Sequence, residues 1–240
     1  MCNAYSLTHP RSDMIAFAED LARQLDLVLA PSPDPPSTSP PIRYRISPTQ
    51  FAPILRLGEA GELALDQAYW GFLVAGARRT FAPTNARDDR LTETWPWQQF
   101  SRAQRCLVPA DGFFEPEKPA GAKGTVPWRY YAMGNRQPFY MAGLYNRAPH
   151  PKTGAATLSF TIVTTEANAL IYRHNRMPAI LDDEACRRWL APGAVPHSVL
   201  GPFPASQMIG HRVCDAARNS RALEHPSMIE PFEAPHDLFS

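Results

Sequence analysis

This chain of 240 residues has little lysine, no cysteines at paired spacing and no long apolar run. Each of these features excludes some classes of protein. The cysteines Cys2, Cys106, Cys186 and Cys214 have no CxxC spacing and no histidine cluster beside them, so we expect no metal site. No apolar run is long enough to span a membrane, and acidic residues interrupt the first apolar segment, unlike a secretory signal. We therefore expect a cytoplasmic protein with reduced thiols and no cofactor.

The basic residues are almost entirely arginine. Lysine occurs at positions 118, 123 and 152, and the other 21 of the 24 basic residues are arginine, with a formal net charge of +1. This total charge does not indicate nucleic-acid binding. The arginine bias has two explanations that the sequence leaves open. Arginine suits bidentate phosphate contacts and base stacking, and a GC-rich genome also favours it.

The chain opens with Met1-Cys2. A small second residue is what methionine aminopeptidase tolerates, so we expect Met1 to be removed and Cys2 to carry a free α-amine beside its thiol. The ordinary pKa values of these two groups are about 8 and about 8.5, so a modest base nearby would activate either one. The alternative is an unstructured terminus in which the cysteine is incidental.

Apolar periodicity predicts a small number of helices. Apolar residues recur every three or four positions over residues 12–29, and a shorter amphipathic pattern covers residues 182–190. A further helix is expected to begin at Thr164 or Thr165 and to end before Pro178, because proline disfavours helical geometry in the residue before it.

Strand patterns outnumber helices. They cover residues 43–46, 51–56, 63–74, 105–115, 128–133, 137–145, 158–164 and 208–213. Gly134-Asn135 predicts a tight hairpin between two of these strands. Since no βαβ alternation occurs, the sequence predicts a mainly antiparallel α+β domain. The proline-rich residues 31–41 are expected to form a surface loop within this domain, and residues 223–240 a tail.

Two polar residues have sequence neighbours that suggest chemistry. Glu115 follows Phe113 and Phe114, so partial desolvation should raise its pKa and suit it to proton transfer near neutral pH. His174 lies between two arginines in a polar turn, which is a poor position for a core histidine. A strand-end glutamate that points to water and a surface histidine are the plain alternatives.

A series of motifs stands in a definite order along the chain. They are Met1-Cys2, RYRISPTQ with Pro48, Trp70-Gly71, Asn85-Ala86-Arg87, RCLVPADGFFE ending at Glu115, Ala142-Gly143-Leu144, and TTEANALIYRHNRMPAIL with His174, Arg176, Met177 and Pro178. Together they resemble the SOS response-associated peptidase (SRAP) family over roughly residues 1–220. The combination of RHNRMPAIL with a cysteine in second place is the most specific part of the resemblance.

The resemblance implies a single SRAP domain over residues 1–222, barrel-like with peripheral helices, that binds single-stranded DNA and becomes covalently attached to abasic sites. Carried over by position, Cys2 is the nucleophile and Asn85 positions its amine or thiol. Glu115 is the acid/base, and His174 assists proton transfer on the sugar.

Other positions are expected to contact or support the DNA. The resemblance implies that Arg87 and Arg176 hold the DNA backbone, and that Trp70 and Pro48 line or support the groove. The family usually has an arginine where this chain has Ala4, so the resemblance implies either weaker phosphate binding or a phosphate contact supplied by Arg11 or Arg45.

The residue types explain the expected adduct. The ring-opened abasic sugar bears an aldehyde, which a neutral α-amine attacks to give an imine. The thiol of the same residue then closes a five-membered thiazolidine, and such ring closures reach effective molarities of about 10⁵ M or more. We expect a monomer with modest affinity for intact single strands and no sequence preference.

Two other functions remain open at this stage. One is an amino-terminal-nucleophile hydrolase or glutamine amidotransferase, which would use the α-amine of Cys2 as a base. The other is a non-catalytic single-strand-binding module in which Cys2 plays no part.

Overall fold

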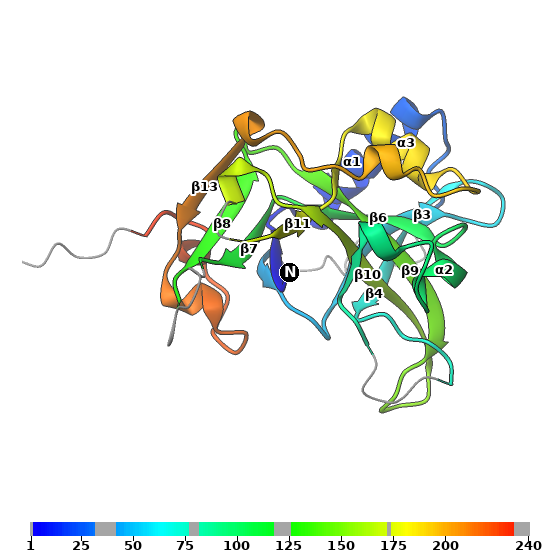
Figure 1. Ribbon diagram of the computed structural model, residues 1–240, viewed down its shortest axis with the longest axis horizontal. Coiled ribbons are helices and arrows are strands. Elements are labelled where there is room, and N and C mark those ends of the chain that lie inside the picture. The colour runs from blue at the N-terminus through cyan, green and yellow to red at the C-terminus, as the bar shows by residue number, and fades with distance from the viewer. Residues whose placement is uncertain (1, 32–41, 77–81, 118–125, 172–173, 233–240) are drawn as a thin grey trace, which may run out of the picture.

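The computed structural model describes residues 2–31, 42–76, 82–117, 126–171 and 174–232, which form two sheets with helices at the periphery (Figure 1). The expected loop at 31–41 lies, from residue 32 on, outside the described residues. The strands are β1 (Ala4–Leu7), β2 (Arg43–Ile46), β3 (Phe51–Leu57), β4 (Leu63–Trp70), β5 (Asn85–Arg87), β6 (Arg105–Ala110), β7 (Gly112–Pro116), β8 (Trp128–Met133), β9 (Phe139–Pro149), β10 (Ala156–Glu166), β11 (Arg176–Pro178), β12 (Ile180–Leu181) and β13 (Met208–Arg212). The α-helices are α1 (Arg11–Leu25), α2 (Trp97–Phe100) and α3 (Asp183–Leu190).

Five strands of the larger sheet close into a barrel. Strand β10 pairs with β4, and the path continues through β3, β6 and β9 back to β10. The β4–β10 pairing is parallel and short, whereas the other four are antiparallel. Gly143 lies where β6 and β9 approach closely, because a Cβ there would stand 2.8 Å from the sulfur of Cys106. The glycine of the Ala142-Gly143-Leu144 motif therefore has a packing reason.

The smaller sheet has five antiparallel strands in the order β13-β8-β7-β1-β2. Strand β1 lies inside this sheet, between β2 and β7, so the beginning of the described chain is hydrogen-bonded on both sides. Its register sets Ala4 opposite Phe114, which brings Cys2 to the end of β7. The N label of Figure 1 accordingly lies between the two sheets.

Aromatic residues from both sheets share one core. The ring of Trp70 in β4 meets the edge of Tyr5 in β1 at a centroid distance of 5.2 Å and stacks on Phe160 in β10 at 6.1 Å. All three side chains are fully buried. Aromatic burial of this kind contributes much of the stability of a core, and it holds β1 against the barrel.

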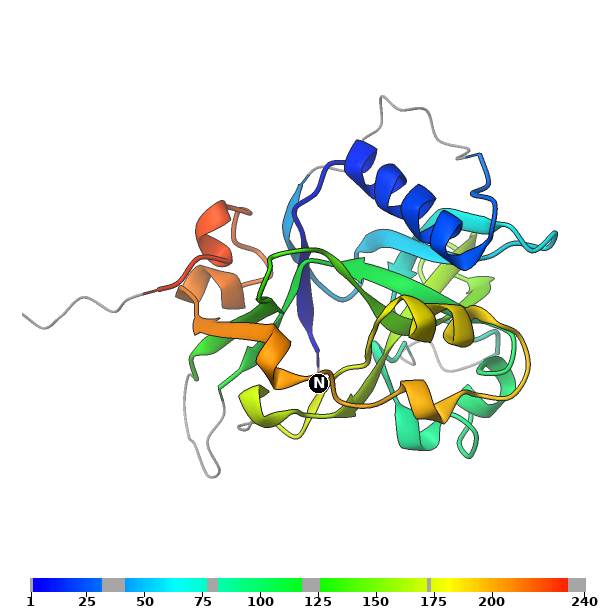
Figure 2. The ribbon, with the colours of Figure 1, turned by 90° about the horizontal axis from the view of Figure 1, so that it is seen from above.

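Helices α1 and α3 pack beside each other on the barrel (Figure 2). The apolar side of α1 is buried through Met14, Ala18 and Leu21, as its periodicity predicts. The helix ends at Leu25 because Asp26 adopts left-handed geometry, with φ 57° and ψ 42°. The prediction that it would continue to residue 29 was therefore wrong at its end.

Two sequence predictions about local structure were wrong. Strands β8 and β9 form no hairpin, because β8 pairs with β7 and β13 in one sheet while β9 belongs to the barrel. The positive φ of this connection falls on Arg136. In its described part, up to residue 171, the expected helix after Thr164 does not form either, since β10 continues to Glu166 and Ala169–Ile171 make a single helical turn. Thr165 pairs with Met177 of β11 instead, so sheet pairing overrides the capping signal.

Ordered packing continues beyond residue 222, the limit expected for the domain. Met228 is 1% exposed and packs with Phe114 and Tyr130 of the smaller sheet. Glu224 pairs with the guanidinium of Arg43 at 2.7 Å. Within the described ranges, no helix has both the length and the apolar composition needed to cross a membrane.

Candidate functional site

Cys2 lies directly before β1 and is fully buried. Its sulfur contacts the carbonyl oxygen of Ala4 at 3.5 Å, with the thiol as donor. Burial raises the pKa of the Cys2 thiol well above its ordinary value, and the nearby charge of Glu115 acts in the same direction. The thiol is therefore protonated at neutral pH, and it needs a base before it can act as a nucleophile.

Glu115 and His174 form a pair beside Cys2. Glu115, in β7, is 1% exposed, and its Oε2 lies 3.5 Å from Nε2 of His174. Burial raises the pKa of Glu115 to about 7. Burial also lowers the pKa of His174, so its ring is neutral at that pH. The carboxyl group is therefore poised to gain or lose a proton near neutral pH.

The backbone fixes which nitrogen of His174 faces the glutamate. Nδ1 lies 2.8 Å from the carbonyl oxygen of Arg176, and a carbonyl can only accept, so Nδ1 carries the proton. The Arg176 amide lies farther from the same nitrogen, at 3.4 Å, so the contact with the carbonyl oxygen is the stronger one. Nε2 is then an acceptor directed at the Glu115 carboxyl, so a proton can pass between the two groups.

Asn85, the first residue of β5, joins the barrel to Cys2. Its Nδ2 donates to the carbonyl oxygen of Cys2 at 2.9 Å and to Oγ1 of Thr84 at 3.0 Å. Its Oδ1 is buried and makes no hydrogen bond with any residue that the structure describes. A buried acceptor without a donor is costly, and this one is held beside the backbone of Cys2, where an amine would satisfy it.

The structure thus brings together the four residues expected to carry the chemistry. Cys2 and Glu115 come from the five-stranded sheet, whereas Asn85 and His174 come from segments attached to the barrel. The contacts of Asn85 with Cys2 and of His174 with Glu115 cross from one sheet to the other. We refer to this place as the junction of the two sheets.

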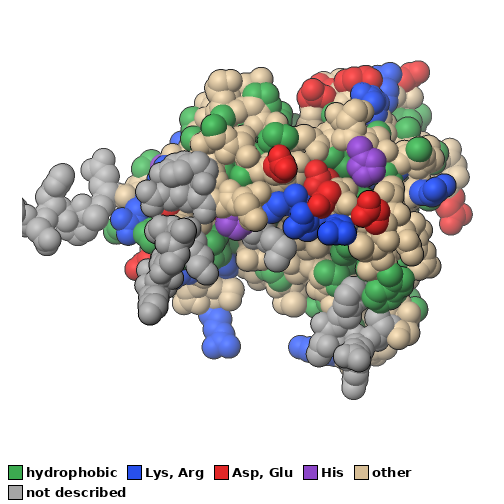
Figure 3. All heavy atoms as spheres, in the orientation of Figure 1, with side chains coloured by type: hydrophobic (Ala, Val, Ile, Leu, Met, Phe, Trp, Pro, Cys, Tyr) green, Lys and Arg blue, Asp and Glu red, His purple; other side chains and the backbone are tan. Residues whose placement is uncertain are grey.

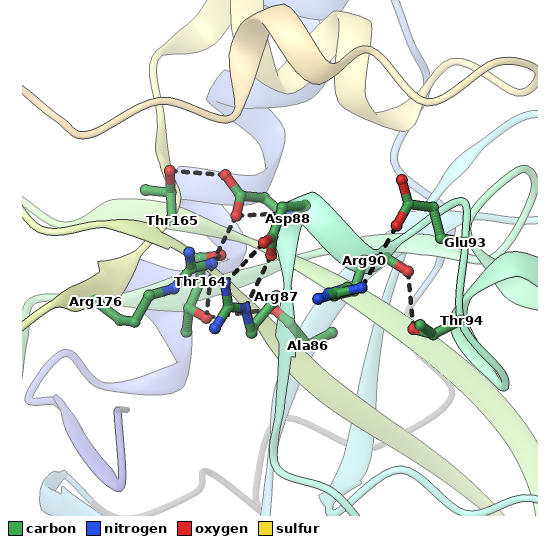
Figure 4. A network of polar contacts seen from close by, with 10 residues as sticks. Ala86, Arg87, Asp88, Arg90, Glu93, Thr94, Thr164, Thr165 and Arg176 are labelled. Atoms are coloured by element: carbon green, nitrogen blue, oxygen red, sulfur yellow. Dashed lines mark hydrogen bonds and ion pairs between the residues drawn. The ribbon is translucent and has the colours of Figure 1, made fainter.

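The two arginines expected to hold DNA both have acidic partners (Figure 4). Arg176 is 7% exposed, and it donates to Asp88 Oδ1 at 2.6 Å and to the carbonyl oxygen of Thr164. Arg87 lies at the surface, where its Nε and Nη2 donate to the two oxygens of Asp89 at 2.9 and 2.7 Å. Figure 3 shows basic and acidic side chains side by side on this face.

Three other predicted DNA-binding residues differ in accessibility. Trp70 is fully buried, and its Nε1 donates to the carbonyl oxygen of Thr84 at 2.9 Å. Trp70 therefore supports the residue that precedes β5, and it cannot stack on a base in this conformation. Arg45 is 6% exposed and donates to Ala217 and Ser47, which argues against a direct phosphate contact. Pro48 is half-buried in the turn between β2 and β3. The side chain of Arg11 is outside what the structure describes.

A second polar cluster, which the sequence analysis did not single out, anchors β1. Asp111, between β6 and β7, accepts hydrogen bonds from Ser6 Oγ and, at 2.5 Å, from both the amide and the hydroxyl of Thr8. His9 lies 3.4 Å from the same carboxylate. Burial would raise the pKa of Asp111, but the hydrogen bonds from His9, Ser6 and Thr8 outweigh it and hold the pKa below its ordinary value.

Several surface cavities lie away from this site. One of about 870 Å³ opens near the β3–β4 turn and is lined in part by Arg56, Glu62 and Arg147. None of the predicted site residues lines it. Among the described residues, no group of three or more histidine, cysteine or acidic side chains could hold a metal ion.

The fold and the site define a class of protein, namely a closed barrel joined to an antiparallel sheet, with a buried cysteine and a glutamate–histidine pair at the junction. A sequence model described as SOS response associated peptidase (SRAP) matches residues 1–220. The chain therefore belongs to the SRAP family, as its motifs predicted.

Several proteins are similar to this chain in sequence over most of its length. The chain is 30% identical over 195 residues to the abasic site processing protein YoqW of Bacillus subtilis, which covers 78% of this chain and 85% of the relative. It is 29% identical over 227 residues to the abasic site processing protein YedK of Escherichia coli, covering 88% and 95%. It is 27% identical over 215 residues to the abasic site processing protein HMCES of Xenopus tropicalis, covering 74% and 63%.

Solved structures confirm the fold. A crystal structure of a Bacteroides thetaiotaomicron protein superposes with a TM-score of 0.75 at 22% identity, covering 97% of this chain and all of that one. A Bordetella bronchiseptica protein superposes with a TM-score of 0.65 at 21% identity, covering 89% and 100%. At these identities the likeness concerns the fold alone.

Proposed function

We propose that this protein processes abasic sites in single-stranded DNA by forming a covalent thiazolidine through Cys2 once Met1 has been removed. The observation that carries the proposal is the pair of buried Glu115 and half-buried His174, 3.5 Å apart, beside a fully buried Cys2. The names of the relatives, which are abasic site processing proteins, support the same lesion as substrate.

The first step is attack of the α-amine of Cys2 on the aldehyde carbon of the ring-opened sugar. A carbon–nitrogen bond forms, and loss of one water molecule leaves an imine. The free Oδ1 of Asn85 is suited to accept a hydrogen bond from that amine and to orient it. Glu115, with a pKa of about 7, gives a proton to the departing water.

The second step is ring closure. The Cys2 sulfur adds to the imine carbon, and the thiol proton passes to the ionised Glu115 carboxylate or to His174, which then delivers a proton to the imine nitrogen to give a neutral thiazolidine. The raised pKa of the thiol supports this order, because the amine is the stronger nucleophile while the thiol is still protonated. Overall the two reactants lose one water molecule.

The roles of the other predicted residues follow from their exposure. Arg87 is the accessible arginine of the pair, so we assign it the phosphate contact, while Arg176 holds the turn that carries His174. Trp70 supports Asn85 through its bond to Thr84. Arg45 and Pro48 shape the β2–β3 side of the groove, and the protein acts as a monomer without metal or cofactor.

The test is intact-mass measurement before and after incubation with a single-stranded oligonucleotide that contains one abasic site. We expect a starting mass without methionine and a heat-stable adduct of protein plus oligonucleotide minus one water. Cys2→Ser keeps the amine and should give only a heat-labile imine, which borohydride traps. Cys214→Ala removes a half-buried thiol from another region and should behave as the wild type.

Two results would contradict the proposal. A processed wild-type protein that forms no adduct would remove the crosslinking function, and release of ammonia or peptide would then favour the amidohydrolase alternative. A heat-stable adduct with Cys2→Ser would show that the sulfur does not close the ring. Salt-sensitive DNA binding without any covalent product would support the non-catalytic alternative.

A further inference from the structure

The two acidic residues that follow Arg87 have different surroundings. The side chains of Asp88 and Arg176 are 18% and 8% exposed. Asp88 also accepts a hydrogen bond from the hydroxyl of Thr165 at 2.9 Å. Asp89 and Arg87 are 48% and 52% exposed. Figure 4 shows Asp88 directed toward Thr165 and Arg176, with Arg87 beside them. Asp88 therefore belongs to the framework, whereas the Asp89–Arg87 pair is open to solvent.

The geometry of the exposed pair is that of a two-point contact. Nε and Nη2 of Arg87 each donate to a different oxygen of Asp89, at 2.9 and 2.7 Å. A phosphate group accepts the same parallel pair of hydrogen bonds from a guanidinium. Asp89 therefore uses the donor atoms through which Arg87 would bind a DNA phosphate.

An exposed ion pair is easily displaced. Pairs of this kind contribute little to stability, since water screens the charges and the side chains lose freedom. A phosphate can therefore replace Asp89, but the displaced carboxylate remains close and repels it. Binding of any strand at Arg87 is weakened without being prevented.

We propose that Asp89 is an internal competitor for the phosphate bound by Arg87, and that it sets the selectivity of the site for abasic over intact single strands. The inference rests on the function proposed above. Reversible binding of an intact strand depends on backbone contacts, so competition at Arg87 reduces it directly. Capture of an abasic strand ends in a covalent bond, so it tolerates a weaker first encounter.

The test is Asp89→Asn, measured by binding of a fluorescent intact oligonucleotide over a range of salt concentrations. We expect affinity to rise by roughly two- to fivefold at low salt, in line with the worth of an exposed pair. Removal of the competing negative charge should also steepen the slope of log K against log salt, by at most about 0.7. The ratio of abasic-site capture rate to intact-strand affinity should fall.

Two controls separate local competition from loss of a negative charge. In an Arg87→Ala background, Asp89→Asn should have no effect on affinity, because the contested donor is gone. Asp20→Asn removes an exposed aspartate that pairs with Arg23 at 3.0 Å on α1, and it should leave both affinity and salt slope unchanged. Matching thermal unfolding curves would show that each variant is folded.

The outcomes distinguish this inference from the proposed function. An unchanged affinity and salt slope in Asp89→Asn, or the same gain in the Arg87→Ala background, would overturn the role of Asp89 even if the wild type forms its adduct. A clear gain for intact strands in a protein that forms no adduct would support the competitor and remove the crosslinking chemistry. Absence of DNA binding by both proteins at low salt would contradict both.

Discussion

Glu115 is the residue whose environment most affects both chemistry and stability. Its carboxyl group is buried, and its pKa is about 7 in the folded chain against an ordinary value of 4.5. The folded state therefore holds a proton that the unfolded state releases between these two values. Stability from the protonated group is present below pH 4.5 and is lost as the pH rises through 7. The raised pKa of Glu115 therefore lowers the free energy of unfolding at neutral and higher pH.

Glu115→Gln should raise the free energy of unfolding at pH 8 by up to about 3 kcal/mol, because the amide cannot ionise and each pKa unit is worth about 1.36 kcal/mol. The gain should vanish near pH 4.5. Urea unfolding at several pH values measures it. Glu166→Gln, at an exposed position at the end of β10, is the control and should show no such pH-dependent gain. An equal increase in the free energy of unfolding at pH 8 and at pH 4.5 would contradict the ionisation of a buried Glu115 carboxyl group.

At this scale the sequence predicted the surroundings of Glu115 better than those of the arginines. Phe113 and Phe114 beside Glu115 correctly indicated desolvation, since both side chains are fully buried. The pairing of Arg87 with Asp89 was missed, because a run of charged residues such as Arg87 to Arg90 is typical of a solvated loop. The burial of Arg45 also could not be predicted from its neighbours in sequence, since its acceptor, the carbonyl oxygen of Ala217, lies 172 positions away.

Among the elements, strand β1 fixes the position of Cys2 in the site. It holds Cys2 at the end of β7 through pairing with β2 and β7, and Asp111 fastens its far end through Ser6, Thr8 and His9. A carboxylate that accepts several hydrogen bonds is worth more than one surface ion pair. The position of the cysteine therefore depends on a cluster at the opposite end of its strand.

Asp111→Asn should lower the free energy of unfolding by about 2–4 kcal/mol at pH 7, because an amide donor then faces the hydroxyl and amide donors that the carboxylate satisfied. Hydrogen exchange of the β1 amides should become faster. Asp215→Asn is the control, since its side chain is 83% exposed and it should change stability by less than about 0.5 kcal/mol. Unchanged exchange in β1 would mean that Asp111 does not anchor the strand.

Most strands could be predicted from alternation, but their partners could not. Residues 43–46 and 128–133 form strands with the expected bounds. The single pattern over residues 105–115 divides at Asp111 into β6 and β7, which enter different sheets. Pairing depends on contacts between distant segments, such as β1 with β7, and a turn signal such as Gly134-Asn135 reports only local geometry.

For the whole molecule, the C-terminal segment matters to the sheet that carries Cys2 and Glu115. Residues after 222 were expected to form a tail, yet Met228 fills a core cluster with Phe114. Glu224 also accepts from the backbone amide of Arg45 at 3.2 Å, next to its ion pair with Arg43. The smaller sheet is therefore completed by residues beyond the family match.

Met228→Ala should lower the free energy of unfolding by about 2–4 kcal/mol, since truncating a buried methionine leaves a cavity. Leu223→Ala, five residues earlier and 92% exposed, should leave stability unchanged. Thermal or urea unfolding compares the two variants. A stable Met228→Ala protein would show that this segment is only loosely attached.

The site at the junction has a consequence for how the molecule unfolds. Asn85 bonded to Cys2 and His174 beside Glu115 connect two sheets that otherwise have separate hydrogen-bond ladders. The two sheets are thus held together by side chains, including the shared aromatic core of Tyr5, Trp70 and Phe160. A strand bound at the junction would contact both sheets, so its binding would stabilise both of them against unfolding.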